Sequence, residues 1–253
     1  MRLSSPLFAL AAPLALTTAA FAADPHPFAV TDLVDFDRVT EPDVSADGKL
    51  AVFTVSTLDL AANRRRTDLW IVPTAGTSAA RRLTSHEAGD ASPAFSPDGR
   101  WIYFLSGRSG GWQVWRIAPD GGEAERVTML PLDVNGFSLA PDGKTLALAI
   151  DVFPECTGPE VLTCTKARLD QREADKASGR IYDELLFRHW DTWADGRRSH
   201  LVVVPVAGGE VRDVMEGMKA DCPSKPFGGM EEVAWTPDSK ALVFSARNVG
   251  REE

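Results

Sequence analysis

One short phrase occurs four times along the chain and limits its fold more than any other feature. The copies are Ser-Ala-Asp-Gly-Lys at 45–49, Ser-Pro-Asp-Gly-Arg at 96–100, Ala-Pro-Asp-Gly-Lys at 140–144 and Thr-Pro-Asp-Ser-Lys at 236–240. Proline fixes φ at about −65° at the second position of the turn, and aspartate suits the position after it. Glycine then adopts the left-handed conformation that reverses the chain. Apolar segments flank each copy, so each predicts a tight turn between two antiparallel strands. A hydroxyl at Ser45, Ser96 or Thr236 is expected to bond the backbone of its own turn.

A second phrase alternates with these turns. It consists of an apolar strand, a glycine-containing turn and another short strand, and it occupies residues 68–84, 113–128 and 200–214. Each repeating unit therefore holds four strands. The turn aspartates stand at positions 47, 98, 142 and 238, so they are 51, 44 and 96 residues apart. The long last step indicates an insertion in the third unit, between its second and third strands.

Four antiparallel strands per unit predict an all-β fold, an incomplete β-propeller with a helical insertion in its third blade. A single four-stranded sheet cannot bury both faces, so it must pack against the next sheet, and repeats of roughly 40 to 50 residues are typical of propeller blades. A β-sandwich with similar hairpins is the alternative, and the regular alternation of the two phrases favours the propeller. We expect about three and a half blades. They lie at 28–84, 85–128, 129–215 with the insertion 151–199, and 216–253.

The last expected blade is incomplete. Propellers close with about four to eight blades, and an open array would leave a strand edge and an apolar face exposed. The sequence stops after Glu253, where the third strand of the fourth blade is expected to begin. We therefore expect this chain to be the front part of a longer protein.

The N-terminus predicts an export signal at residues 1–22. Arg2 supplies the positive charge, residues 7–16 form an apolar stretch, and Ala20, Phe21 and Ala22 form a small-x-small cleavage site. The apolar stretch is too short to span a bilayer as a helix, and no later stretch approaches about 18 apolar residues. We expect a periplasmic or secreted protein without a membrane segment.

Charge and cysteine content narrow the range of partners. The net charge of −9 argues against binding to nucleic acid or anionic lipid, which needs a clustered positive field.

In an exported protein, Cys156 and Cys164, eight residues apart, favour a local disulfide. No Cys-x-x-Cys or nearby histidine pair completes a metal site, and no phosphate loop is visible, so we expect neither a metal nor another cofactor. Cys222 either pairs with something beyond this chain or is a free thiol, and we favour the first.

The insertion departs from the strand pattern. Residues 166–178 are charged and lack glycine and proline, and residues 180–193 follow helical spacing, with Gly179 between them. We therefore expect two helical pieces. The aromatic residues of the second piece either line a ligand cavity, cover a neighbouring domain, or pack the insertion onto the blades, which is the favoured interpretation. His189 is expected to be a hydrogen-bonded core histidine.

One pattern resembles a catalytic motif. Residues 107–111 read Gly-Arg-Ser-Gly-Gly and match the Gly-x-Ser-x-Gly of a nucleophile elbow. That motif requires a strand-to-helix turn, which raises the serine above an oxyanion hole. Here residues 112–117 alternate as a strand, so we expect a hairpin loop. The chain thus contains no predicted catalytic residue.

A longer stretch resembles a known family. Residues 182–193, Tyr-Asp-Glu-Leu-Leu-Phe-Arg-His-Trp-Asp-Thr-Trp, and residues 196–201, Gly-Arg-Arg-Ser-His-Leu, are the specific part of the resemblance. They resemble the propeller of secreted bacterial dipeptidyl aminopeptidases and acylaminoacyl peptidases of the prolyl oligopeptidase family. The resemblance extends over residues 24–253 and includes the entry Phe-Ala-Val-Thr-Asp-Leu at 28–33. The Ser-Pro-Asp-Gly turns are also similar to those of the Tol-Pal translocation protein.

The resemblance implies a function for the propeller. Family members continue through further blades into a C-terminal α/β-hydrolase domain with a Ser, Asp and His triad, and this sequence contains none of that domain. The propeller shields the active site, admits short peptides and helps to hold their free N-terminus. An ammonium group needs a carboxylate, and an aromatic wall can bind the neighbouring side chain. The candidates for substrate binding are Glu184, Arg188, Trp190 and Trp193. The alternative is a non-catalytic periplasmic propeller that binds a protein partner, as the Tol-Pal component does.

Overall fold

The computed structural model describes residues 27–177, 179–182 and 187–247. The described residues before Asp35 belong to one unit, and those from Asp35 belong to another. In the first unit, Val34 N donates to Thr31 O (3.0 Å) near the start of the short helix α1 (Asp32–Asp35). The predicted signal peptide lies outside the described residues. No helix along the described residues combines the length and apolarity that crossing a membrane requires.

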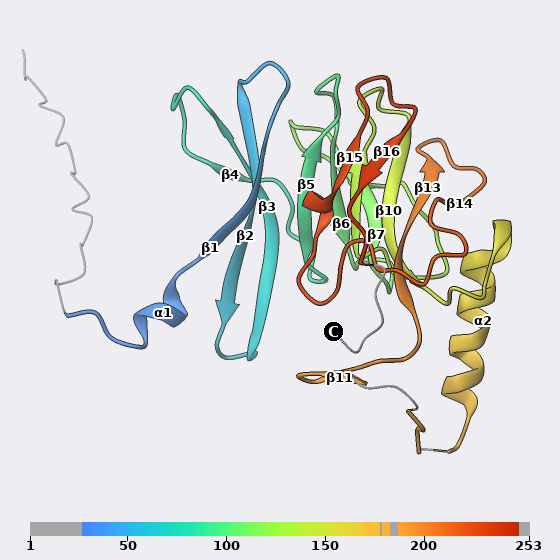
Figure 1. Cartoon of the computed structure of the whole chain (residues 1–253). Coiled ribbons are helices and arrows are strands. Elements are labelled where there is room, and N and C mark those ends of the chain that lie inside the picture. The colour runs from blue at the N-terminus through green and yellow to red at the C-terminus, as the bar shows by residue number, and fades with distance from the viewer. Residues whose placement is uncertain (1–26, 178, 183–186, 248–253) are drawn as a thin grey trace, which may run out of the picture. The chain divides into compact units, whose positions relative to one another are not determined.

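Three four-stranded antiparallel sheets follow one another in the second unit, each with its strands paired in chain order (Figure 1). The first consists of β1 (Arg38–Val44), β2 (Leu50–Asp59), β3 (Arg64–Pro73) and β4 (Arg81–Arg82). The second consists of β5 (Asp90–Phe95), β6 (Ile102–Ser106), β7 (Gln113–Ile117) and β8 (Glu125–Arg126). The third consists of β9 (Gly136–Leu139), β10 (Thr145–Val152), β13 (Arg198–Pro205) and β14 (Arg212–Asp213). A two-stranded sheet of β15 (Val233–Trp235) and β16 (Leu242–Phe244) comes last, so the predicted incomplete propeller is confirmed.

The repeated phrase forms the turn between the first two strands of each sheet. Ser45 Oγ donates to Asp47 Oδ1 (2.7 Å) and accepts from Leu50 N (3.0 Å), as predicted for the turn hydroxyl. Ser96 and Thr236 repeat both bonds in their own turns. The glycines of the first three copies have φ of 71°, 68° and 70°, and Ser239 adopts 62° in the fourth. Its hydroxyl accepts from Asp142 N (3.0 Å), which ties the fourth turn to the third.

Hydrophobic clusters lie between successive sheets. Strand β6 is buried along its whole length because its two faces serve different clusters. Ile102 and Phe104 pack with Val52, Leu69 and Ile71 of the first sheet. Tyr103 and Leu105 pack into the cluster that includes strand β10. A third cluster lies between the third sheet and the two-stranded sheet.

Carboxylates of β1 also connect the first sheet to the second. Both strands β1 and β5 contain a bulge, with Glu41 at φ 52° and Ser92 at φ 53°. The Glu41 carboxylate accepts from Ser92 N (2.9 Å) and Ser92 Oγ (2.9 Å). Asp43 Oδ2 accepts from Phe95 N (2.6 Å). The bulge in β5 leaves Ser92 N outside the strand pairing, and Glu41 of the neighbouring sheet satisfies it.

In each sheet, a polar residue near the start of the third strand bonds to the chain segment that follows that strand. The residue type differs between the sheets, but its position is equivalent. In the first sheet, Asp68 forms an ion pair with Arg82 (2.5 Å). In the second, Gln113 holds the segment after β8 by four hydrogen bonds. In the third, buried His200 contacts Asp213 Oδ2 (2.7 Å) through Nδ1 and Met218 O (3.0 Å) through Nε2. A buried polar group needs partners, and Gln113 and His200 have them at every polar side-chain atom, whereas Asp68 is paired only through Oδ2 and its buried Oδ1 has no hydrogen-bond partner among the described residues.

The insertion between β10 and β13 is anchored at several points. It contains a 3-10 turn, η1 (Gly158–Glu160), and helix α2 (Val161–Ala174). A disulfide joins Cys156 and Cys164 (Cα–Cα 5.7 Å). The guanidinium groups of Arg168 and Arg172 lie over the ring of buried Phe153, at 4.2 Å and 4.5 Å. A second 3-10 turn, η2 (Met230–Glu232), precedes β15.

The predicted second helical piece is wrong where the structure describes it. Strands β11 (Arg188–His189) and β12 (Thr192–Trp193) form a hairpin, with Trp190 at φ 47° in its turn. Helical spacing would have placed His189 and Trp193 on one face. The hairpin separates them, because successive residues of a strand point to opposite faces. His189 is exposed, so the expectation of a core histidine is also wrong, and buried His200 takes that role.

The turn hydrogen bonds predict a pH-dependent stability. The Ser96 hydroxyl, followed by Arg100 N and the Arg100 side chain, lowers the pKa of Asp98 from 3.8 to about 2. Because the folded pKa lies below the unfolded one, this stabilisation is complete above about pH 4 and is lost as the pH falls through the folded value. Asp98→Asn should therefore lower the free energy of unfolding at about pH 6, and its difference from wild type should shrink toward about pH 2.5.

Urea unfolding across that pH range measures the effect. Asp120→Asn, at another exposed turn aspartate, is the matched control. A difference between Asp98→Asn and wild type that stays constant with pH would contradict the role given to the turn hydrogen bonds.

Candidate hollows beside the insertion helix

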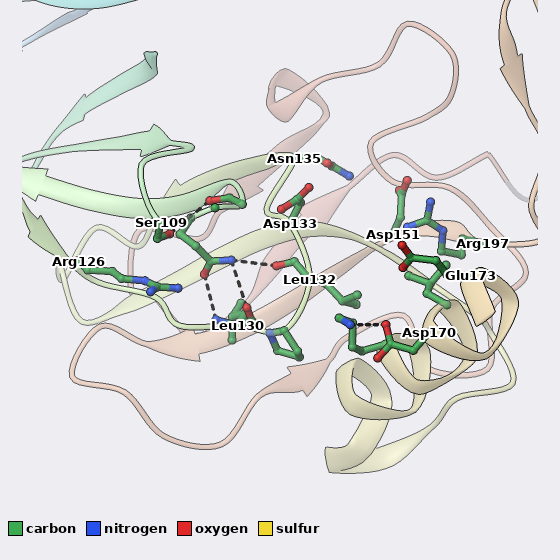
Figure 2. A pocket seen from close by; sticks show the side chains of 16 residues that line it. Ser109, Arg126, Leu130, Leu132, Asp133, Asn135, Asp151, Asp170, Glu173 and Arg197 are labelled. Carbon is green, nitrogen blue, oxygen red and sulfur yellow. Dashed lines mark hydrogen bonds and ion pairs between the residues drawn. The ribbon is translucent and has the colours of Figure 1, made fainter. Parts of the chain in front are cut away.

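Two hollows flank helix α2. The first, of about 600 Å³, lies between α2, the β6–β7 loop and residues 130–135 (Figure 2). The second, of about 590 Å³, is lined by the end of α2, residues 179–182, Phe187 and the segment that precedes β13. Both hollows are therefore products of the insertion packed against the sheets.

Gln113 fixes one wall of the first hollow. Its side-chain amide donates to Leu130 O (3.3 Å) and Leu132 O (2.9 Å), and its carbonyl oxygen accepts from Thr128 Oγ1 (2.9 Å) and Leu130 N (3.0 Å). In Figure 2, dashed lines mark the bonds that reach Leu130 and Leu132 at the edge of the hollow. Gln113 is buried, so all of its hydrogen-bonding capacity is used inside the protein.

Most charged groups at the first hollow are paired. Lys166 forms an ion pair with Asp170, and Asp151 forms one with Lys225 (2.8 Å). Asp133 Oδ1 accepts from Trp112 N (2.9 Å), which leaves its other oxygen available. An added Cβ at Gly111 would lie 2.6 Å from Asp133 Oδ1, the oxygen that accepts from Trp112 N, so the loop needs glycine there.

Glu173 adds a second available carboxylate to this hollow. It lines the cavity, and no described residue forms an ion pair or hydrogen bond with its side chain. Figure 2 shows Glu173 on the helix side and Asp133 on the loop side. A hollow with two available carboxylates is suited to bind an ammonium group.

The Gly-x-Ser-x-Gly sequence forms a hairpin loop, as the sequence indicated. It connects β6 to β7, and the Ser109 hydroxyl donates to Gly111 O (3.4 Å) within the same loop. A nucleophile elbow needs a helix after the serine, and here a strand follows.

The three described candidates for substrate binding lie in the hairpin and are not among the residues that line the two hollows. The Arg188 guanidinium lies 5.3 Å from the centre of the Trp193 ring, which stacks on Tyr182 and Phe187 (5.9 Å each). Trp190 belongs to a separate cluster with His189 (4.8 Å) and Phe227 (5.8 Å). Glu184 lies outside the described residues.

The aromatic rings do not pack the insertion onto the blades, which the sequence had favoured. Trp190 is 75% exposed, Trp193 49% and Phe187 41%. The residues that do line the second hollow include Tyr182 and Phe187, from the family-specific stretch, and Lys219, which is distant in sequence. The family-specific stretch at 182–193 indicated Tyr182 and Phe187 as site residues. No feature of the sequence indicated that Lys219 lies at the same hollow.

Cys222 is a buried free thiol. It lies in the cluster between the third sheet and the two-stranded sheet, with no exposed surface. Burial, with a smaller effect of Glu232, raises the pKa of its thiol to about 11. The structure therefore favours an unreactive packing role over the expected pairing with something beyond this chain.

Comparisons with known proteins agree with this architecture. The family model described as TolB beta propeller domain matches residues 35–152. Dipeptidyl-peptidase 5 of Porphyromonas gingivalis is 30% identical over 213 residues, which cover 83% of this chain and 30% of that protein. The chain is a relative of the propeller part of prolyl oligopeptidase-family peptidases. The chain thus spans less than a third of the length of that relative.

One solved structure and one local sequence match add to these comparisons. The acylaminoacyl peptidase structure of Pyrococcus horikoshii superposes with a TM-score of 0.53 at 13% identity, over 75% of this chain and 27% of that one, which shows a common fold. The Tol-Pal system protein TolB of Bordetella pertussis is 46% identical over 56 residues, which cover 22% of this chain and 13% of that protein.

The hydrogen bonds of Gln113 predict a sensitive position. Gln113→Glu replaces two donated bonds by contacts between a carboxylate and two carbonyl oxygens in a buried place. We expect the free energy of unfolding to fall by about 3 kcal/mol. Urea unfolding measures it, with Gln171→Glu on the exposed side of α2 as the control. A loss no larger than that of the control would contradict the role of Gln113 as the support of this wall.

Proposed function

We propose that the chain is the N-terminal propeller of an exported serine peptidase of the dipeptidyl aminopeptidase or acylaminoacyl peptidase type. It gates and positions short peptides for a C-terminal α/β-hydrolase domain, which supplies the nucleophilic serine. The observation that carries the proposal is the 30% identity to dipeptidyl-peptidase 5, which extends over 83% of this chain. A periplasmic or secreted location is inferred from the predicted signal peptide and is in keeping with the TolB relative.

The first hollow supports a role in positioning substrates. A peptide with a free N-terminus carries an ammonium group, and the available oxygens of Asp133 and Glu173 are charge-complementary to it. The exposed rings of Trp190 and Trp193, together with Arg188, remain candidates for contacts with the rest of the peptide. Glu184 remains a further candidate from the sequence.

The second candidate function is a non-catalytic propeller that binds a protein partner. It is favoured by the TolB-type family model at residues 35–152 and by the local identity to TolB of Bordetella pertussis. The two functions predict different sequences downstream in the reading frame. A strand, a Gly-x-Ser-x-Gly turn and a helix in that region support the peptidase, whereas their absence from a complete frame supports the partner-binding propeller.

Kinetics of the longer protein test the positioning role. Asp133→Asn combined with Glu173→Gln should raise KM for dipeptide-releasing substrates with a free N-terminus by about tenfold, with little change in kcat, because uniform binding is lost. Asparagine at 133 can still accept from Trp112 N, so the loop should keep its structure. Glu123→Gln, at an exposed loop position, is the control. Equal KM values for the double variant and wild type would count against this hollow as the N-terminus site.

A further inference from the structure

The carboxylates that line the second hollow each have at least one partner within the protein. Asp175 Oδ1 accepts from Ala177 N (2.9 Å), and Asp195 accepts from Arg197 N (3.0 Å) and Arg197 Nε (2.7 Å). Glu155 forms an ion pair with Arg168 (2.9 Å). Burial by itself raises the pKa of Glu155, but the Arg168 hydrogen bond and, more weakly, the charge of Lys219 hold that pKa below its ordinary value. Each acidic group of this hollow thus has a partner within the protein.

Two of the four cations at this hollow lack such partners. Arg172 donates to Asp195 O (2.6 Å), and Arg198 forms an ion pair with Asp221 (2.8 Å). Neither Lys219 nor Arg180 forms an ion pair with any described residue, although both line the hollow. The electrostatic balance of the hollow therefore favours an added negative charge.

A hydroxyl at the same hollow also lacks a partner. The Tyr182 Oη atom is buried, and no hydrogen bond to it is formed by the described part of the chain. A buried hydroxyl without a partner costs free energy that a bound acceptor would recover. Lys219, Arg180 and Tyr182 together present donors, and an anion presents only acceptors.

An aromatic wall adjoins these donors. The Tyr182 and Phe187 rings both line the hollow, their centres are 5.2 Å apart, and Trp193 stacks on each of them. Such a wall offers apolar surface that a small inorganic ion cannot use. The ligand best matched to donors beside aromatic rings is an organic carboxylate with an apolar group next to it.

We propose that the second hollow binds a carboxylate group of a peptide, with Lys219 and Tyr182 as donors and the Tyr182–Phe187 wall against the neighbouring side chain. The proposal rests on the proposed peptide-handling function for the choice of a peptide, and on the hollow itself for the carboxylate. Two sources share this chemistry, the C-terminal carboxylate and an acidic side chain.

Calorimetric titration of the 253-residue chain tests the proposal. The probes are N-acetyl-Ala-Phe with a free carboxylate, its C-terminal amide, and N-acetyl-Glu-Phe amide, in which only the side chain is acidic. At least one acidic peptide should bind about tenfold more tightly than N-acetyl-Ala-Phe amide, because the neutral amide cannot form the charge-assisted hydrogen bond. The tighter acidic peptide identifies the source of the carboxylate. Equal affinity of all three would overturn the proposal.

Two variants link binding to the named donors. Lys219→Gln should weaken the acidic peptides by about tenfold, whereas Lys144→Gln, at an exposed turn lysine, should leave their binding unchanged. Tyr182→Phe should also weaken them while the free energy of unfolding stays equal or rises, because the unpaired hydroxyl is removed. A Tyr182→Phe protein that is destabilised and binds normally would show a purely structural hydroxyl and contradict the proposal.

Other outcomes separate this inference from the proposed function. Sulfate should bind at least about tenfold more weakly than the acidic peptides, and equal binding would overturn the part given to the aromatic wall. Peptide binding that depends on Asp133 and Glu173 but not on Lys219 would refute this site and leave the positioning role intact. The opposite result is also informative. If carboxylate binding depends on Lys219 but the complete reading frame encodes no peptidase domain, the site is supported and the proposed peptidase function is refuted.

Discussion

Strands buried on both faces are the constraint on which the rest of this structure depends. Strand β6 sends Ile102 and Phe104 into one cluster and Tyr103 and Leu105 into the next, so neither face reaches water. Burial of each such side chain is worth roughly 1.5 to 3 kcal/mol, and no single sheet provides it alone. The sheets must therefore stack, and the turns and the Glu41 and Asp43 contacts act within that stack.

The stack also explains where the hollows arise. A repeated four-stranded sheet leaves little room for a site of its own, because its side chains are used for packing. The insertion between β10 and β13 adds groups that packing does not need. It is held by the Cys156–Cys164 disulfide and by the Phe153 ring, over which the guanidinium groups of Arg168 and Arg172 lie. Each side of α2 then forms a wall of one hollow, with available carboxylates in the first and available donors in the second.

Much of the fold could be predicted because its signals are local. A turn is recognised from consecutive residues, and the spacing of Asp47, Asp98, Asp142 and Asp238 located both the blades and the insertion. The site was harder, because helical and hairpin pairing compete in a short aromatic segment. Residues 187–193 have an apolar pattern that suits either, and the turn at Trp190, a residue seldom found at positive φ, decided for the hairpin.

The sequence by itself determined the four turns, the order of strands, the rejection of Ser109 as a nucleophile and the kinship with peptidase propellers. Each of these depends on residues that are neighbours in the chain. Only the tertiary structure decided that Lys219 faces the same hollow as Tyr182, that Asp133 lies across from Glu173, and that Cys222 is enclosed. These relations join residues far apart in sequence, and they arise from how sheets and insertion pack, which no local pattern encodes.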